Sequence, residues 1–181
     1  MYHNIFDSHA HYDDEQFDTD RAELLGSFKE KGISGIVCCG VNIETSEFAV
    51  ELSHKYDFMY SAVGFHPLDN DEYKDGDLER IKELASDPKC VAIGEIGLDY
   101  HYEKESRENQ LIILEKQIQL ANELDMPIIF HDRESHEDTL NILKKYKPKG
   151  VVHCFSGSAE TAKEILKLGM MISFTGVITF K

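Results

Sequence analysis

The stretch Cys90-Val91-Ala92-Ile93-Gly94-Glu95 is an apolar run that ends on a carboxylate, where the chain turns polar. Residues 4–11, 127–131 and 150–153 have the same form, but they end on histidine. Runs this short and apolar are typical of buried strands. One such ending would mean little, whereas the repetition predicts one site assembled from several strand ends. The potential metal ligands are His9, His11, Glu95, His131 and His153.

Seven short apolar runs alternate with amphipathic stretches along the chain. Strands are expected at residues 4–9, 35–41, 59–65, 90–95, 127–131, 150–154 and 170–174. The clearest helix is predicted over residues 106–124, where one buried face repeats at helical spacing through Leu111, Leu114, Ile118 and Ala121. Ser135, followed by Asp138, and Ser158 are expected helix caps, and Gly32 and Gly169 are expected helix ends. Repeated βα units predict a parallel sheet.

The positions of the ligands distinguish two ways to arrange such a sheet. In a barrel all strand ends meet at one mouth, whereas in an open sheet they spread along a line. We therefore expect an α/β fold of the TIM-type (β/α)8 barrel class, with residues 1–181 forming a single hydrolase barrel domain. Such barrels usually need ~250 residues, and this chain ends soon after the seventh expected strand. The expectation is an incomplete barrel that lacks the eighth strand and the last helices.

The composition narrows the classes of function and partner. The net charge is −15, and no run of Lys and Arg exceeds Lys144-Lys145, so binding of nucleic acid by charge alone is disfavoured. Bound cations would have to supply positive charge to a phosphate. The four cysteines lack the spacing of a disulfide framework, and no secretory signal or membrane-length apolar run is present. We expect a cytoplasmic protein with no membrane association and no obligate protein partner.

His9 and His11 are expected to share one face of a strand, because residues two apart point the same way. They can therefore hold one divalent cation together. Asp7 lies on the same face and has two interpretations. Its carboxylate either orients an imidazole N–H or accepts a backbone hydrogen bond near the strand end.

Glu95 is costly to bury between apolar neighbours unless it is paired or binds a metal. Its two oxygens could bridge two cations ~3.5–4 Å apart, and His131 and His153 would complete the second set. Imidazole and carboxylate ligands suit Zn, Mn, Co or Fe, and Mg becomes suitable when phosphate supplies oxygens. We therefore expect two divalent metal ions.

Two further residues could contact substrate. His66, in Gly64-Phe65-His66-Pro67, could donate a hydrogen bond to a substrate oxygen. Arg133 could hold an anion in its guanidinium fork or pair with a loop carboxylate. Asp99 and Tyr100 either anchor a loop or line the mouth.

Five ordered motifs of this sequence resemble signatures of the TatD family of metal-dependent deoxyribonucleases. They are residues 6–11, 64–67, 93–100, 129–133 and 153–157. The resemblance implies an amidohydrolase-type barrel in which His9, His11 and Glu95 bind one metal, while Glu95, His131 and His153 bind the other. It also implies an Asp after an eighth strand, which this chain does not contain.

The expected function is metal-dependent hydrolysis of DNA phosphodiester bonds by an exonuclease that acts on single strands or strand ends. Catalysis would depend on Glu95, while His66 and Arg133 position phosphate oxygens. One alternative is an amidohydrolase that cleaves a C–N or ester bond, including that of an aminoacyl-tRNA. The other is an inactive, truncated metal-binding chain.

Overall fold

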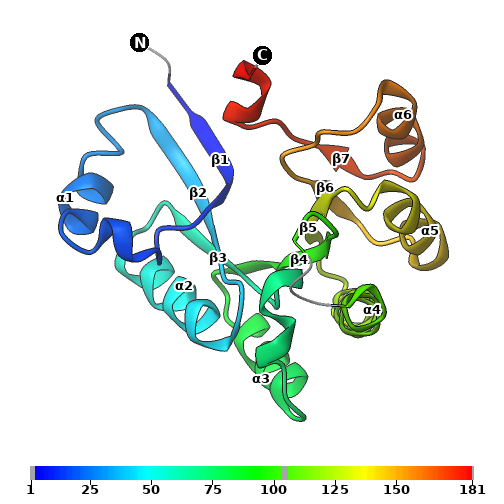
Figure 1. Ribbon diagram of the computed structural model, residues 1–181. Helices are drawn as coiled ribbons and strands as arrows, with labels where there is room; N and C mark the ends of the chain where they lie inside the picture. Colours follow the sequence, from blue (N-terminus) through cyan, green and yellow to red (C-terminus); the bar gives the residue numbers. More distant parts are fainter. Residues whose placement is uncertain (1–2, 103–105, 181) are drawn as a thin grey trace.

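The computed structural model describes residues 3–102 and 106–180, and the described strands form one parallel seven-stranded sheet in chain order. The strands are β1 (Ile5–Ala10), β2 (Ile33–Cys39), β3 (Met59–Val63), β4 (Cys90–Asp99), β5 (Ile128–Arg133), β6 (Gly150–Val152) and β7 (Met171–Ile172). The sheet curls, with β1 and β7 at its two edges (Figure 1). The expected α/β class and the incomplete barrel are therefore confirmed.

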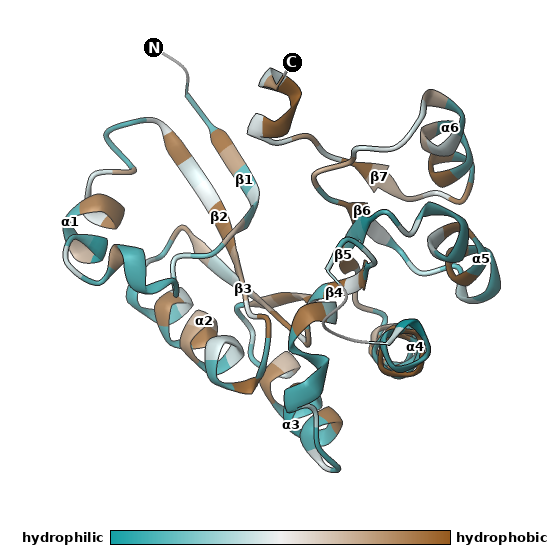
Figure 2. Cartoon of the chain, in the orientation of Figure 1, coloured by the Kyte–Doolittle hydropathy of each residue, from teal (hydrophilic) through white to brown (hydrophobic). Residues whose placement is uncertain are grey.

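Helices follow the strands and cover the outer side of the curled sheet (Figure 1). They are α1 (Arg21–Gly26), α2 (Ile43–Lys55), α3 (Asp77–Ala85), α4 (Arg107–Glu123), α5 (His136–Tyr146) and α6 (Ala159–Lys167). Short 3-10 turns are η1 (Glu15–Phe17), η2 (Pro67–Glu72) and η3 (Gly176–Thr179). Helices α2 to α6 carry both hydrophobic and hydrophilic residues, as helices between a core and solvent require (Figure 2). None of the described helices has the length and apolar character needed to cross a membrane.

Two strands continue further than the sequence pattern predicts. We expected Glu95 and His131 to end their strands, but β4 runs on to Asp99 and β5 to Arg133. The reason is tertiary: after a register shift, the polar ends of the two strands still pair, with Gly97 opposite His131 and Asp99 opposite Arg133. Gly97 has φ +154°, and a Cβ there would lie 2.0 Å from the carbonyl oxygen of His131. Only glycine allows this close approach.

Of the predicted caps, Ser158 is confirmed, because its Oγ accepts the Thr161 N–H at 3.1 Å. Ser135 is at the expected N-cap position of α5, directly before His136, but its side chain makes no capping hydrogen bond. Its hydroxyl instead lies 2.6 Å from the carboxylate of Asp132 and 3.1 Å from the carbonyl oxygen of Leu98. The carboxylate of Asp138 accepts the Tyr100 hydroxyl at 2.8 Å instead.

Gly169 has φ +85° and directly follows Leu168, the C-cap of α6, so this expected helix end is confirmed. Gly32 has φ +87° but lies beyond α1, which ends at Gly26, so the expectation that it ends a helix was wrong. Three of the four cysteines, Cys38, Cys39 and Cys90, are buried, and all four are free thiols. This agrees with the interpretation of the strand cysteines as small core residues.

Helix α4 contacts the sheet through polar as well as apolar side chains. Leu114, Ile118 and Ala121 are buried as predicted, whereas Leu111 is only partly buried. The same face also buries two glutamines, which the apolar pattern did not predict.

These glutamines each pair with the backbone of one residue near a strand end. Gln117 accepts the Phe65 N–H at 2.7 Å and donates to its carbonyl oxygen at 3.0 Å. Gln110 makes the equivalent pair with Asp99, at 2.9 and 2.8 Å. Helix α4 therefore holds the backbone of the segments that follow β3 and end β4, where the candidate site begins.

Candidate metal centre

The carboxylate of Glu95 lies at the centre of a cluster of imidazoles, and the residue is only 3% exposed. Its Oε2 is 2.9 Å from Nε2 of His9 and 3.1 Å from Nε2 of His11. Its Oε1 is 3.0 Å from Nδ1 of His131 and also contacts Nε2 of His153. The structure thus brings together all five side chains that the sequence predicted as ligands, with two imidazoles on each carboxylate oxygen.

The spacing of these donor atoms fits a metal ion. Nε2 of His9 and Nε2 of His11 are 3.2 Å apart, and each lies within 3.1 Å of the same Glu95 oxygen. Tetrahedral ligands ~2.0–2.2 Å from a cation lie roughly 3.3–3.6 Å from one another, close to this triangle. Four imidazole nitrogens and a buried carboxylate are also a suitable donor set for a transition metal.

Atoms on the far side of the rings determine which nitrogen faces the centre. Nδ1 of His11 donates to the carbonyl oxygen of Cys39 at 2.9 Å, which leaves Nε2 with a free lone pair. Nε2 of His131 lies 3.0 Å from the carboxylate of Asp99, which leaves Nδ1 directed at Glu95. A carboxylate behind a histidine is a common way to orient a metal ligand and increase its basicity.

Asp99 is therefore a site residue to which the sequence reasoning gave no definite role. It is 1% exposed, although it is an acid in the run Ile96-Gly97-Leu98-Asp99. That signal was the same one that identified Glu95: a carboxylate in an apolar strand requires a partner.

Charges in the centre are strongly coupled. Burial raises the pKa of Glu95, but hydrogen bonds from the four surrounding imidazoles outweigh it and hold the pKa well below its usual range. Burial also opposes protonation of His131, yet Asp99 and Glu95 raise its pKa to about 9. The pKa of His153 is lowered, chiefly by burial. Without a cation, positive charge on an imidazole thus balances the buried carboxylate.

His66 lies beside the centre, with Nε2 3.8 Å from Oε1 of Glu95. Its Nδ1 accepts the N–H of Leu68 at 3.2 Å, so in the neutral ring the proton is on Nε2. Burial lowers its pKa to about 4, and the ring is therefore neutral at pH 7. His66, Glu95 and His131 are close enough together to hold a metal. The tautomer instead makes Nε2 of His66 a hydrogen-bond donor directed at the centre.

Arg133 and Asp7 had two interpretations each. The guanidinium carbon of Arg133 lies 4.9 Å from the centroid of the Tyr102 ring. No carboxylate in residues 3–102 or 106–180 forms an ion pair with Arg133, so the structure does not support the interpretation as a loop ion pair. Asp7 accepts the backbone N–H of His9 at 3.1 Å, which favours the backbone interpretation.

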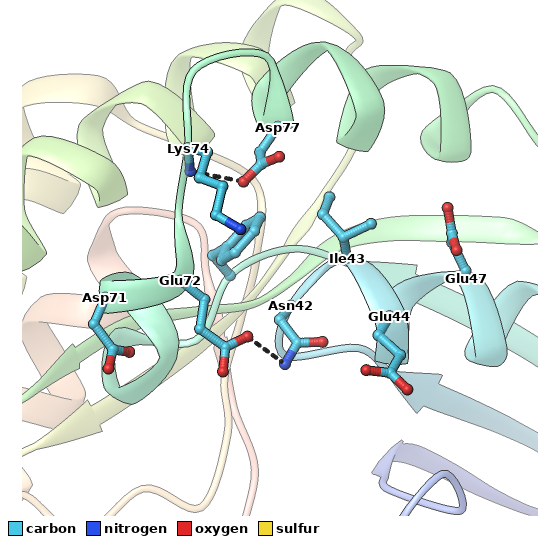
Figure 3. A pocket seen from close by; sticks show the side chains of 9 residues that line it. Asn42, Ile43, Glu44, Glu47, Asp71, Glu72, Lys74 and Asp77 are labelled. Atoms are coloured by element: carbon cyan, nitrogen blue, oxygen red, sulfur yellow. Dashed lines mark hydrogen bonds between the residues drawn. The ribbon is translucent and has the colours of Figure 1, made fainter.

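A cavity of about 610 Å³ lies between the start of α2 and the segment around η2, outside the histidine cluster (Figure 3). Five acidic residues and one basic residue, Lys74, are the charged residues that line it. The acidic ones are Glu44, Glu47, Asp71, Glu72 and Asp77. The Glu72 carboxylate accepts a hydrogen bond from Asn42 at 3.3 Å. A polyanion would be repelled here, so the histidine cluster is the better candidate for phosphate chemistry.

A curled parallel sheet covered by helices, with a carboxylate shared among imidazoles, defines a metal-dependent hydrolase of the barrel class. The family described as TatD related DNase matches residues 6–181, and this chain belongs to that family.

The relatives agree with this assignment. The chain is 43% identical over 180 residues to the "Uncharacterized metal-dependent hydrolase YabD" of Bacillus subtilis, covering 98% of this chain and 71% of the relative. It is 32% identical to the "3'-5' ssDNA/RNA exonuclease TatD" of Escherichia coli K12, covering 95% of this chain and 67% of the relative. The crystal structure of YJJV, a TatD homologue from E. coli K12, matches with a TM-score of 0.92 at 32% identity, covering 97% of this chain and 70% of that one.

Proposed function

We propose that this chain hydrolyses phosphodiester bonds of DNA at a centre of two divalent cations. His9 and His11 would hold one cation, His131 and His153 the other, and Glu95 would bridge them. The observation that carries the proposal is that each oxygen of the Glu95 carboxylate contacts two imidazoles. Four imidazole nitrogens around one buried carboxylate are a donor set that could hold two divalent cations.

The nitrogen-rich donor sets favour Zn, Mn, Co or Fe, and Mg becomes suitable if phosphate oxygens complete its shell. When bound, such cations neutralise charge on the phosphoryl group and lower the pKa of a bound water. Around them, the structure supports two roles for the protein. His66 is a neutral donor that can bind a phosphate oxygen through Nε2, and Arg133 can hold a second oxygen in its fork.

The charge of the protein supports action at a strand end. With a net charge of −15, the molecule lacks the basic surface that would follow a long nucleic acid. Contacts with one or two nucleotides near the metal centre would suffice for an exonuclease. The name of the E. coli relative, a 3'-5' exonuclease on single-stranded DNA and RNA, supports the same preference.

The decisive assay measures nucleotide release from single-stranded DNA by the 181-residue protein with Mn, Mg, Zn or Co added, beside a panel of amides and esters. We expect release that EDTA abolishes and that Glu95→Gln reduces by at least about 100-fold, the scale of losing one catalytic electrostatic group. Glu123→Gln, at an exposed carboxylate paired with Lys82, is the matched control. Hydrolysis of an amide or ester without DNA cleavage would contradict the proposal and favour a C–N or ester hydrolase.

A further inference from the structure

Tyr102, just beyond the end of β4, is an aromatic side chain held at the surface. The residue is 48% exposed, in a chain where most large apolar side chains of the strands are buried. One neighbour is the guanidinium of Arg133, 4.9 Å from the ring centroid. Another is the ring of His101, in edge contact at 4.7 Å. Nearly half of the residue's surface still faces solvent, available to a flat ligand.

The backbone of Tyr102 is tied to the metal centre through one carboxylate. Oδ2 of Asp99 binds the ring of His131, while its Oδ1 accepts the backbone N–H groups of His101 and Tyr102 at 2.9 and 3.4 Å. The N–H of Tyr100 also bonds to the carbonyl oxygen of Arg133 at 2.9 Å. The backbone of Tyr102 is therefore linked to a candidate metal ligand through a single buried side chain.

Arg133 brings a positive charge to the same place. It is two residues beyond His131 on β5, and it pairs in register with Asp99. Two other arginines pair with carboxylates: Arg21 with Asp18, and Arg80 with Glu47 and Glu83. Arg107 lies over the Tyr100 ring, 4.3 Å from its centroid. Within the described part of the chain, the Arg133 guanidinium has no such carboxylate partner. Among the described residues, a half-exposed ring thus lies beside a guanidinium that has no carboxylate partner.

We propose that Tyr102 and Arg133 form a subsite for one nucleotide of single-stranded nucleic acid, with the base stacked on the Tyr102 ring and a phosphate held by Arg133. The inference rests on the proposed function and names the group that would position its substrate. Stacking on an aromatic side chain tolerates any base, and it suits a protein that cannot bind through net charge. Loss of one stacked base weakens binding by about 5- to 100-fold.

The test measures anisotropy of a 5'-fluorescein single-stranded oligonucleotide whose 3' linkages are phosphorothioates that resist cleavage. Tyr102→Ala should weaken binding at least about fivefold. Tyr102→Phe keeps the ring and should bind as the parent protein does. Ile112→Ala, at a residue 49% exposed on α4, controls for removal of exposed apolar surface and should change nothing. A second oligonucleotide lacks the bases of its 3'-terminal nucleotides, and it should bind the parent and Tyr102→Ala proteins equally weakly.

The outcomes separate this inference from the proposed function. The stacking site is overturned if the Tyr102→Ala protein binds both oligonucleotides with the affinity of the parent protein. It is also overturned if the substitution lowers the affinity for both oligonucleotides equally. Both conclusions hold whether or not DNA is cleaved. The stacking site is overturned as well if the parent protein binds neither oligonucleotide. Base-dependent binding that requires the Tyr102 ring supports the subsite even if no nucleotide is released, in which case only the nuclease proposal fails. Arg133→Gln should weaken binding to both oligonucleotides, because it acts on phosphate rather than on the base.

Discussion

At the scale of single residues, the candidate centre depends on atoms behind the imidazoles as much as on the imidazoles themselves. The carbonyl oxygen of Cys39, the carboxylate of Asp99 and the N–H of Leu68 each bind one ring nitrogen of a histidine. Each contact determines which nitrogen remains for the centre, and so decides whether the ring offers a lone pair or a proton. The roles of His11, His66 and His131 are thus set by their outer neighbours.

Asp99→Asn should reduce metal affinity by about 10- to 100-fold, the usual cost of weakening a partner behind a metal-binding histidine. The amide keeps the shape but removes the negative charge that faces His131. Affinity is measured by competition with a chelating dye. Asp87→Asn removes a charge from another aspartate that pairs with a histidine, His54, outside the centre, and it should bind metal normally. Equal affinities for the two variants would show that Asp99 has no such role.

His66 should make the metal-free protein less stable in acid. Its pKa falls from 6.5 to about 4 on folding, chiefly through burial. Between these values the unfolded chain binds a proton that the folded chain excludes, so the free energy of unfolding decreases as the pH drops. The contribution at pH 5 is about 2 kcal/mol.

The measurement is urea unfolding in EDTA at pH 7.5 and pH 5 for the parent and His66→Gln. The loss of stability between the two pH values should be smaller in His66→Gln by about 2 kcal/mol. A loss that is identical in the two proteins would mean that His66 does not exclude the proton.

At the scale of elements, α4 links β4, which carries Glu95 and Asp99, to the segment after β3 that leads to His66. The side-chain amide of Gln110 pairs with the backbone N–H and carbonyl oxygen of Asp99, and that of Gln117 with those of Phe65. Buried backbone groups must be paired, so a helix with two glutamines one heptad apart can hold two strand ends at once. The position of the site therefore depends on this helix.

Gln117→Ala should lower the free energy of unfolding by about 2 to 4 kcal/mol, because it leaves a buried N–H and a buried carbonyl oxygen of Phe65 without partners. Gln119→Ala, two residues away on the exposed side of α4, should cost less than about 0.5 kcal/mol. Urea unfolding of both variants checks the difference. Similar stabilities would refute the proposed role of the Gln117 amide.

At the scale of the molecule, the two edge strands of the sheet are not paired with each other among the described residues. Figure 1 shows the edge strands β1 and β7 apart from one another. Apolar side chains near these edges and on η3 are exposed. They include Phe6 at 56%, Met171 at 65%, Ile178 at 70% and Phe180 at 77%. Unpaired edges and exposed apolar groups favour association.

The 181-residue protein should therefore associate at micromolar concentration, and the double variant Ile178→Lys, Phe180→Lys should do so less. Sedimentation velocity over a concentration series measures this. Ile112→Lys places a charge at an exposed apolar residue on α4, away from the edges, and should leave association unchanged. Concentration-independent sedimentation of the parent protein would contradict the prediction.

The amino-acid sequence by itself determined the class of fold and the candidate ligands. Apolar runs alternating with helical periodicity specify βα units through local interactions, and parallel strands place their carboxyl ends at one edge. When such a sheet curls into a barrel, histidines and a glutamate at these ends approach one another. The strand positions and the order of the sheet followed from this reasoning, as did the role of the strand cysteines as core residues.

Only the tertiary structure decided how the side chains divide their contacts. Which oxygen of Glu95 faces which imidazole, and whether Asp7 binds backbone or ring, depends on rotamers and on strand register. Gln117 pairs with the backbone of Phe65, 52 residues away, and the Ser135 hydroxyl reaches Leu98, 37 residues away. Local periodicity carries no information about such partners, because each contact exists only after distant segments have packed together.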